Sequence, residues 1–244
     1  MKLPVKLGKD YLKDAIFEVR FTSGLSEELI PGVIKCALED FEYKPPKQIH
    51  QRWGGKTTNV TTFRSDVGLF VKNGFKVKYL PGPHGSLNFN MIDHYPGWAT
   101  YFSLIKEVLE KVEKAGVINN FQRLGLRYIS IHPVKDVFKH ITGTFSLEVN
   151  QQSLDKRNTI IRIEDDAEDF HRVIQIGNQT KYDNDSKQTQ TKGIFDIDIH
   201  CDCKDHGITE SLLRKIDDMH MLQKKTYFGL LHAAYLEKLE PQYK

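Results

Sequence analysis

Residues 195–203, FDIDIHCDC, alternate apolar and polar side chains at every step. Successive side chains of a β-strand point to opposite faces, so this pattern predicts a strand with one apolar and one polar face. The apolar face would carry Phe195, Ile197, Ile199 and Cys201. A strand of this kind has to bury its apolar face, and we expect the long amphipathic helix predicted over 209–236 to cover it.

The remaining patterns repeat this organisation along the chain. Alternation predicts a strand over 15–21, apolar residues at helical spacing predict helices from Ile30 and over 96–116, and the Asn73–Gly74 pair indicates a tight hairpin. Further strands are expected between them, including 47–53 and 57–64, whereas the polar stretch 179–193 is typical of a loop.

Each half of the chain therefore has the order strand, helix, several antiparallel strands, long helix. This order predicts an α+β protein made of two tandem related halves, residues 1–118 and 119–244. Each half is expected to be a curved, mostly antiparallel sheet with long helices packed on one face. If the halves pack side by side, a groove between them is the default place for a ligand.

The composition is that of an ordinary globular protein, with 39% hydrophobic and 27% charged residues in 244. The first residues contain no apolar segment typical of a secretory signal, and the three cysteines have no disulfide-framework spacing. We therefore expect a cytoplasmic protein that is not in a membrane. The sequence has no Walker loop, no nucleophile elbow, no HExxH and no Rossmann glycine pattern, so it favours a non-catalytic protein without a cofactor.

The polar face of the 195–203 strand offers one catalytic alternative. Asp196, Asp198 and His200 follow one another at every second position and could hold a hard divalent cation for a nuclease or hydrolase. Cys203 and His206 could join Cys201 in a zinc site, but the Cys-x-Cys step is not the usual spacing and a second ligand pair is missing. The simpler interpretation is a solvated polar face.

Arg123 and Arg127 lie four residues apart in another predicted strand, on the same face, with Gly125 between them. Arginine binds carboxylate or phosphate through two parallel hydrogen bonds, and a glycine allows close approach of a ligand to the backbone. These residues, with the neighbouring Tyr128, are candidates for binding an anion. The alternative is that the arginines pair with acidic neighbours at the surface.

The segment 44–79 is strongly basic, with a single opposing carboxylate, Asp66, and several aromatic residues. Basic strands with interleaved aromatic residues are typical of nucleic-acid surfaces, although aromatic residues also fill sheet cores. The nucleic-acid candidates in this segment are Lys56, Arg64, Lys72, Lys76 and Lys78. The acidic cluster 164–169 could face this segment within the protein or between two copies, so a homodimer is one expected state.

The segment Tyr95–Trp98, YPGW, opens the helix predicted over 96–116. An aromatic pair on each side of Pro-Gly could form a stacking platform for a ligand. Because tyrosine and tryptophan bury large areas, the favoured interpretation is packing at the start of the helix.

Five segments together resemble an uncharacterised, sporadically distributed family of prokaryotic proteins about this size. They are LPVKLGKDYLKDAIFEVRF (3–21), YPGW (95–98), QRLGLRYISI (122–131), FDIDIH (195–200) and MHMLQKKTYFGLL (219–231). The resemblance covers nearly the whole chain and implies an Asp-x-Asp strand, matched by Asp196 and Asp198, but no established activity or cofactor. It does not extend to His200, Cys201 and Cys203, which weakens the zinc alternative.

The resemblance also implies a context, because a patchy distribution is typical of mobile or defence-associated genes. The leading prediction is therefore a non-catalytic binding or interaction module, an accessory protein in a mobile-element, toxin–antitoxin or defence system, that binds a partner protein or an anion. A metal-dependent nuclease or hydrolase and a nucleic-acid-binding protein are the two alternatives.

Overall fold

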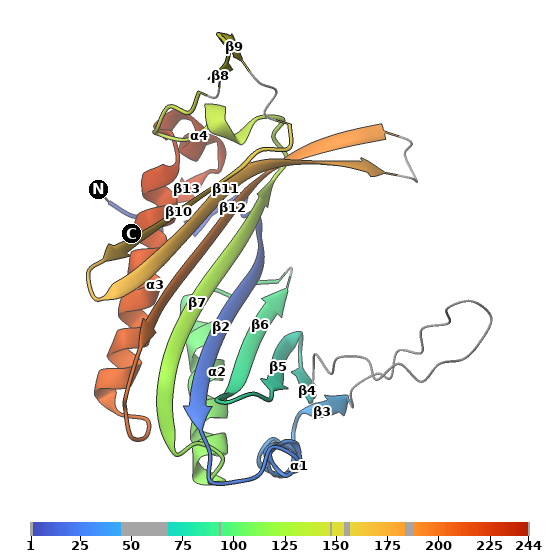
Figure 1. Cartoon of the computed structure of the whole chain (residues 1–244), viewed down its shortest axis with the longest axis vertical. Helices are drawn as coiled ribbons and strands as arrows, with labels where there is room; N and C mark the ends of the chain where they lie inside the picture. Colours follow the sequence, from blue (N-terminus) through green and yellow to red (C-terminus); the bar gives the residue numbers. More distant parts are fainter. Residues whose placement is uncertain are drawn as a thin grey trace, which may run out of the picture.

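A computed structural model describes residues 2–44, 68–92, 94–146, 148–153, 157–183 and 188–243. The described strands form one large sheet in which every neighbouring pair is antiparallel, together with two small two-stranded sheets. From one edge to the other (Figure 1), the nine strands of the large sheet are β10 (Ile160–Ala167), β11 (Phe170–Asp183), β12 (Gln188–Asp202), β7 (Asn120–His132), β2 (Leu12–Thr22), β6 (Gly85–Ile92), β5 (Phe75–Leu80), β4 (Leu69–Lys72) and β3 (Glu42–Lys44).

Each half of the chain contains a strand, a later strand that returns to pair with it, and a long helix. The first half starts with β2, returns in β6 to pair with it, and continues into helix α2 (Trp98–Lys114). The second half starts with β7, returns in β12 to pair with it, and continues into helix α3 (Glu210–Leu230). The halves join edge to edge, because β2 also pairs with β7. A common order does not show a common origin, so duplication stays a prediction.

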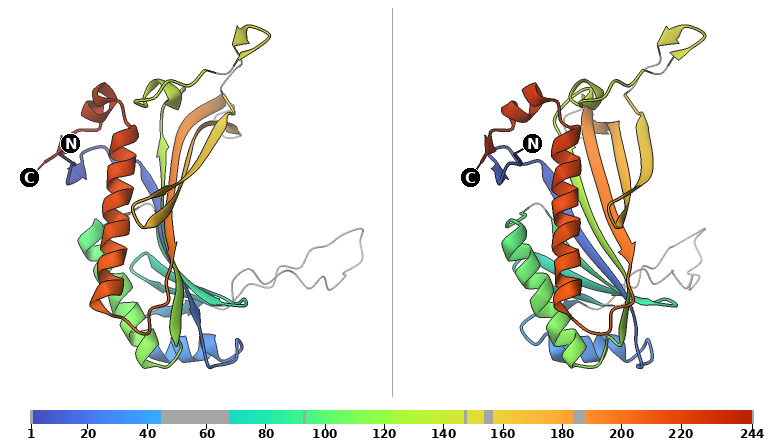
Figure 2. Two further views of the ribbon diagram at one scale, coloured as in Figure 1. Left: turned by 60° about the vertical axis from the view of Figure 1, so that its left-hand side comes forward. Right: turned by 90° about the vertical axis from the view of Figure 1, so that its left-hand side faces the viewer.

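Helices α2 and α3 lie on the same face of the sheet (Figure 2). The α+β prediction, with helices packed on one face of an antiparallel sheet, is therefore confirmed. Helix α1 (Ile30–Ala37) starts where the sequence predicts, with Pro31 in its first turn, where a missing backbone N–H is tolerated. No helix in the described part of the chain is both long enough and apolar enough to span a membrane.

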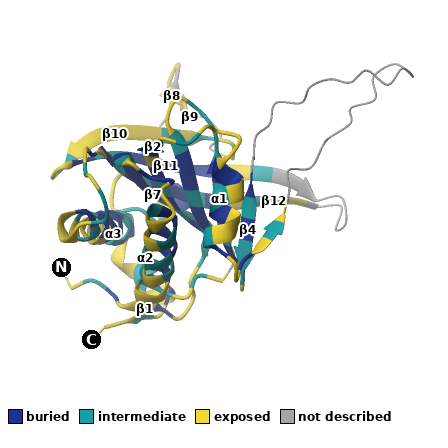
Figure 3. Ribbon diagram, turned by 90° about the horizontal axis from the view of Figure 1, so that it is seen from below, coloured by how far each residue is buried: buried dark blue, intermediate teal, exposed yellow. Residues whose placement is uncertain are grey.

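The hydrophobic core lies between the sheet and these helices (Figure 3). In β2 the buried side chains are the alternate residues Ala15, Phe17, Val19 and Phe21. In β12 the buried apolar side chains include Phe195, Ile197, Ile199 and Cys201, the four that the alternation assigns to the apolar face. Helix α3 contacts β12 and β7 and covers this face, as predicted.

The long C-terminal helix is shorter than predicted. Helix α3 ends at Leu230, Leu231 is extended, and a separate helix α4 (Ala233–Lys238) follows. The break occurs where the chain bonds to another segment: Thr142 N donates to the Leu230 carbonyl, and His232 N donates to the His140 carbonyl. Helical periodicity does not reveal such long-range backbone bonds, so the sequence pattern continues through the break.

The prediction of a loop over 179–193 is wrong for most of these residues. β11 continues to Asp183 and β12 starts at Gln188, so the two strands form a long hairpin. Thr180 and Thr191 lie opposite each other with their hydroxyl oxygens 2.8 Å apart. The ladder extends without any apolar periodicity because cross-strand polar pairs and backbone hydrogen bonds are sufficient to continue it.

The remaining elements are short. β1 (Lys6–Leu7) pairs with β13 (Pro241–Gln242), which brings the two ends of the chain together. β8 (Glu148–Val149) pairs with β9 (Gln152–Ser153), and a 3₁₀ turn, η1 (Val137–Lys139), follows β7. The strands predicted over 47–53 and 57–64 lie outside the described residues.

Candidate functional site

The face of the sheet opposite α2 and α3 carries most of the predicted site residues. We call it the open face, because no described helix packs on it. In each strand, the open face carries the residues that alternate with those buried against the helices. On the five central strands they include Asp14, Ile16, Glu18, Arg20, Lys76, Lys78, Asn88, Asn90, Arg123, Arg127, Asp196, Asp198 and His200.

Arg127 and Asp196 form a two-point ion pair between β7 and β12. Arg127 Nε donates to Asp196 Oδ1 at 2.7 Å and Nη2 donates to Oδ2 at 2.6 Å. Gln175 Nε2 adds a third hydrogen bond to Asp196 at 3.4 Å. The hydrogen bonds with Asp196 raise the pKa of Arg127, so the guanidinium stays charged. The pair uses both carboxylate oxygens of Asp196 within the sheet itself.

Arg123 has a partner of the same kind on β2. Its Nη1 donates to Glu18 Oε1 at 3.0 Å, and Arg20 Nε donates to the same oxygen at 2.8 Å. Two guanidinium groups therefore share one carboxylate. The predicted alternative, in which the arginines pair with acidic neighbours, describes both Arg123 and Arg127.

Tyr128 points away from the two arginines. It lies on the helix side of β7, where its hydroxyl is 2.8 Å from the Tyr95 hydroxyl and 3.3 Å from His220 Nδ1. Burial raises the pKa of Tyr128 well above its usual range. One small anion on the open face would therefore not contact all three predicted residues.

The YPGW segment packs against helix α3. The Trp98 ring stacks on His220, with ring centres 4.1 Å apart and planes 7° apart, and Trp98 Nε1 donates to Asp217 Oδ1 at 2.6 Å. Tyr95 lies edge-on to Tyr101 and Tyr128. These contacts match the packing interpretation of the segment, because both aromatic rings are engaged by the protein core.

The three residues of the predicted metal site share the open face of β12 but differ in surroundings. Asp196 is bound by Arg127, whereas burial raises the pKa of Asp198. His200 Nδ1 is 3.9 Å from Asp198 Oδ2, too far for a hydrogen bond, and burial, followed by the charge of Arg123, lowers the pKa of His200.

The cysteines do not assemble into the zinc alternative. Cys201 and Cys203 are buried, and burial raises the pKa of both thiols, that of Cys203 to about 11. Thiolates are the form that binds zinc, so this environment opposes metal binding. Among residues 2–44, 68–92, 94–146, 148–153, 157–183 and 188–243, no three His, Cys, Asp or Glu side chains are grouped closely enough to hold a metal ion together.

The predicted nucleic-acid residues separate into three groups. Lys56 and Arg64 lie outside the described residues. Lys72 pairs with Asp40 and lies over the ring of Phe41, beside α2, away from the open face.

Lys76 and Lys78 lie on the open face, opposite Asn90 and Asn88 of β6. Neither lysine has a carboxylate within ion-pair distance among the described residues, which distinguishes them from the arginines of β2 and β7. Asp14 of β2 also lies on this part of the open face and interacts electrostatically with both lysines. Burial raises the pKa of its carboxyl group, whereas a hydrogen bond from Asn90 and the charges of the two lysines lower it.

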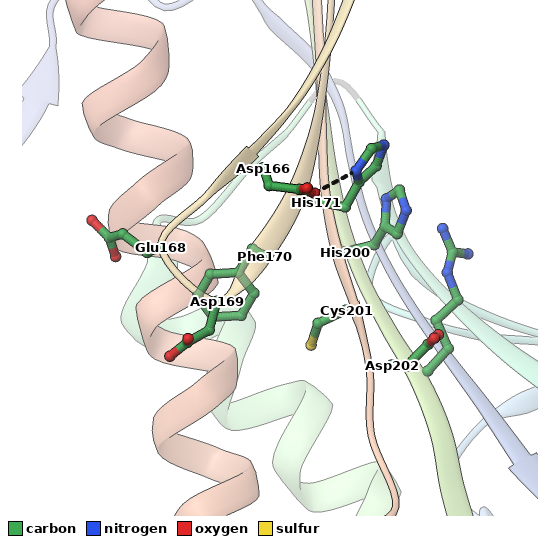
Figure 4. A pocket seen from close by; sticks show the side chains of 9 residues that line it. Asp166, Glu168, Asp169, Phe170, His171, His200, Cys201 and Asp202 are labelled. Atoms are coloured by element: carbon green, nitrogen blue, oxygen red, sulfur yellow. Dashed lines mark hydrogen bonds and ion pairs between the residues drawn. The ribbon is translucent and has the colours of Figure 1, made fainter.

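The structure also contains a pocket that the sequence did not predict (Figure 4). It has a volume of about 540 Å³ and lies between the β10–β11 turn and the end of β12, with Arg123 at its side. His171 and His200 lie side by side in it, with ring centres 4.8 Å apart. The cross-strand partnership of the two histidines depends on the register of β11 against β12, which composition and spacing do not reveal.

Two of the acidic side chains around this pocket, Asp166 and Glu168, are paired. Asp166 accepts a hydrogen bond from His171 Nδ1 at 2.9 Å, and Glu168 accepts one from Lys225 Nζ at 3.0 Å. Hydrogen bonds with Asp166 and Glu164 raise the pKa of His171. Four residues of the acidic cluster 164–169 are therefore bound to residues of the same sheet or of α3: Glu164, Asp165, Asp166 and Glu168.

Comparisons with known proteins add no family to these observations: no family model matches the chain, and no curated protein or solved structure matches it. The resemblance carried by the five sequence segments therefore stays a prediction.

Proposed function

We propose that the protein is a non-catalytic binding module that holds an anionic ligand on its open face, at the end formed by β5 and β6. Lys76 and Lys78 carry this proposal, because both are neighbouring lysines of the open face with no carboxylate partner among the described residues. A free ammonium group can bind a ligand without first breaking an ion pair inside the protein. The sequence prediction placed the anion at Arg123 and Arg127 instead.

The ion pairs of β2, β7 and β12 support a structural role for the carboxylates of the open face. Asp196 has no free oxygen for a cation, because Arg127 binds both of its oxygens. Glu18 is shared by Arg20 and Arg123. A metal-dependent hydrolase that uses Asp196, Asp198 and His200 would first have to break the pair with Arg127. The geometry therefore favours the binding module.

The side chains beside the two lysines are suited to recognition of a polar anion. Asn88 and Asn90 lie directly opposite Lys78 and Lys76, so two ammonium groups and two amides occupy neighbouring positions of β5 and β6. An amide side chain both donates and accepts hydrogen bonds, whereas an ammonium group supplies charge. Carboxylate, sulfate and phosphate groups fit this combination.

Chromatography on immobilised heparin, an anionic polymer, tests the proposal. We expect the protein to bind and the double variant Lys76→Glu/Lys78→Glu to elute at clearly lower salt. Lys106→Glu/Lys114→Glu is the matched control, because it makes the same change of charge on α2, on the other side of the sheet. Equal loss of retention in both double variants would show that net charge, and not the open face, causes binding.

A nucleic acid is the second candidate, because its phosphates would meet the same pair of free lysines. Binding of a labelled single-stranded oligonucleotide, followed by fluorescence anisotropy, should then weaken as salt rises. The loss of two phosphate contacts in Lys76→Glu/Lys78→Glu should reduce the slope of log K against log salt by about 1.4. An acidic protein as ligand would leave the oligonucleotide unbound in wild-type protein while heparin still binds.

A further inference from the structure

β10 is a free edge of the large sheet (Figure 2). It pairs with β11 on one side and with no described strand on the other. Asn178 N donates to the Thr159 carbonyl, which places the backbone groups of odd-numbered residues of β10 toward β11. The even-numbered residues therefore direct their N–H and C=O groups outward: Ile160, Arg162, Glu164 and Asp166.

The edge strand also exposes apolar surface. Ile160 is 58% exposed and Ile163 is 48% exposed, although Ile163 lies opposite the buried Ile174 of β11. Ile161 and Ile163 are on the helix side of the sheet and continue its apolar face to the edge. A free edge with exposed isoleucines can pair with a strand of another chain, because its backbone groups are unpaired and its apolar side chains are exposed.

We propose that this edge pairs with β10 of a second copy of the chain, antiparallel, about a two-fold axis at Ile163. With an axis perpendicular to the sheet, the helices of both copies lie on the same face of the joined sheet. Residues i and j can then oppose each other only if both are even-numbered or both are odd-numbered. With the axis at Ile163, each Arg162 opposes the Glu164 of the other copy. The two Ile163 side chains oppose each other.

Charge selects this register over its neighbours. An axis at Arg162 would place the two Arg162 side chains against each other, and an axis at Glu164 would do the same for the two Glu164 side chains. An axis at Asp165 would oppose the two Asp165 side chains. Like charges directly opposite each other in a sheet are destabilising, whereas opposite charges stabilise the pair. The Ile163 axis is the one of these four in which no side chain opposes another of the same charge.

The pairing satisfies the backbone groups that β10 leaves free. Ile160, Arg162, Glu164 and Asp166 would form hydrogen-bonded pairs across the axis, two bonds in each of four pairs. The two Ile163 residues would form a non-hydrogen-bonded pair, in which Cα atoms come to about 4.5 Å. The open faces of both copies would then lie on one side of a continuous sheet, whatever ligand they bind.

A charge-exchange experiment tests this dimer. Sedimentation velocity should show wild-type protein dimerising, weakly because a single strand pair makes a small interface, at concentrations up to about 200 µM. Arg162→Glu and Glu164→Arg should each weaken the dimer at least about tenfold, because each places like charges opposite each other twice. A mixture of the two variants should form a heterodimer, in which every substituted side chain opposes the other charge.

The heterodimer separates pairing between copies from the hydrogen bond that Arg162 makes to Glu164 within one chain. Neither variant alone can restore that internal pair, so recovery in the mixture requires contact between chains. A wild-type protein that stays monomeric over the whole range, or a dimer unaffected by both substitutions, would overturn the proposal. So would a mixture that forms no heterodimer.

A crosslink checks the register. Ile163→Cys in a Cys36→Ser background should form a disulfide-linked dimer on mild oxidation, because the two introduced thiols oppose each other. The background removes the one exposed native cysteine, and the other two are buried. Ile160→Cys is the matched control, since it would oppose Asp166 and should crosslink far less. Crosslinking that is equal at both positions would overturn the Ile163 axis.

Discussion

Arg127 and Asp196 hold β7 and β12 together on the open face by two hydrogen bonds of 2.7 and 2.6 Å. The Asp196 side chain is only 12% exposed, whereas that of Arg127 is 42% exposed. Such an arrangement places the carboxylate inside the sheet surface and covers it with the guanidinium. The pair gives Asp196 a structural partner, which is why we propose ligand binding at another part of the open face.

The first prediction concerns the energy of this pair. Arg127→Ala should destabilise the fold by about 2 kcal/mol, because it leaves the nearly buried Asp196 carboxylate without its main donor. Adding Asp196→Ala to that variant should cost little more. The measurement is a double-mutant cycle by urea denaturation at pH 7.

The exposed pair Lys106–Glu110 on α2 is the control for this cycle. Its coupling energy should be at most about 0.5 kcal/mol, as for other exposed pairs at this helical spacing. A coupling between Arg127 and Asp196 no larger than that of the control would contradict the structural role of the pair.

The second prediction concerns two buried histidines on the helix side of the sheet. Burial lowers the pKa of His132 to about 4 and that of His220 to about 3, against an ordinary value of 6.5. His132 lies between the hydroxyl groups of Tyr235 and Tyr227, whereas His220 lies under Trp98. Both rings are therefore neutral in the folded protein at pH values where they bind protons in the unfolded chain.

The unfolded state consequently takes up more protons below pH 6.5, so stability is full above that value and falls as the pH decreases toward 4 and then 3. Between pH 7 and pH 5 each histidine should reduce the free energy of unfolding by about 2 kcal/mol. Urea denaturation at the two pH values measures this, and His220→Gln should reduce the dependence on pH. Replacing the exposed His84 by Gln should not change it.

The third prediction compares two glycines. A Cβ at Gly177 of β11 would lie 2.5 Å from the Thr159 carbonyl oxygen and 2.8 Å from Ile160 Cα, both backbone atoms of the neighbouring strand. Gly177→Ala should therefore destabilise the protein, by about 1–3 kcal/mol. Gly229 near the end of α3 has nothing within 4 Å of a Cβ, so Gly229→Ala should be neutral or stabilise by up to about 1 kcal/mol. Thermal denaturation of both variants gives the comparison, and equal effects would count against the β10–β11 register.

The fourth prediction concerns divalent cations. Because Arg127 binds both oxygens of Asp196, addition of millimolar Mg²⁺ or Mn²⁺ should leave the melting temperature unchanged. A clear rise in melting temperature that Asp198→Ala abolishes would instead support the metal-dependent hydrolase.

Much of this architecture could be predicted from local periodicity. Alternation in 15–21 and 195–201 assigns the buried faces of β2 and β12 correctly, because each strand has a single apolar side that must be covered. The start of α1 at Ile30 and the end of α2 before Gly116, whose φ is +74°, follow from the backbone preferences of proline and glycine.

What the sequence could not show depends on partners distant in the chain. The end of α3 depends on bonds to residues 140–142, and the length of the β11–β12 hairpin depends on pairing between polar residues. The alternation along β7 places the two arginines, Arg123 and Arg127, on one face of the sheet and Tyr128 on the other. Their partners come from other parts of the chain and are not visible in the sequence pattern: Glu18, Asp196 and Tyr95. A candidate binding residue is recognisable by type, whereas its availability depends on which neighbours the fold supplies.

Lysine footprinting in the presence of heparin oligosaccharide tests the binding surface most directly. Acetylation of each lysine by a water-soluble reagent, read by mass spectrometry with and without the oligosaccharide, reports which ammonium groups the ligand covers. The proposal predicts that Lys76 and Lys78 are protected several-fold while Lys106 and Lys114 on α2 react unchanged. Protection of the α2 lysines with Lys76 and Lys78 still fully reactive would contradict it.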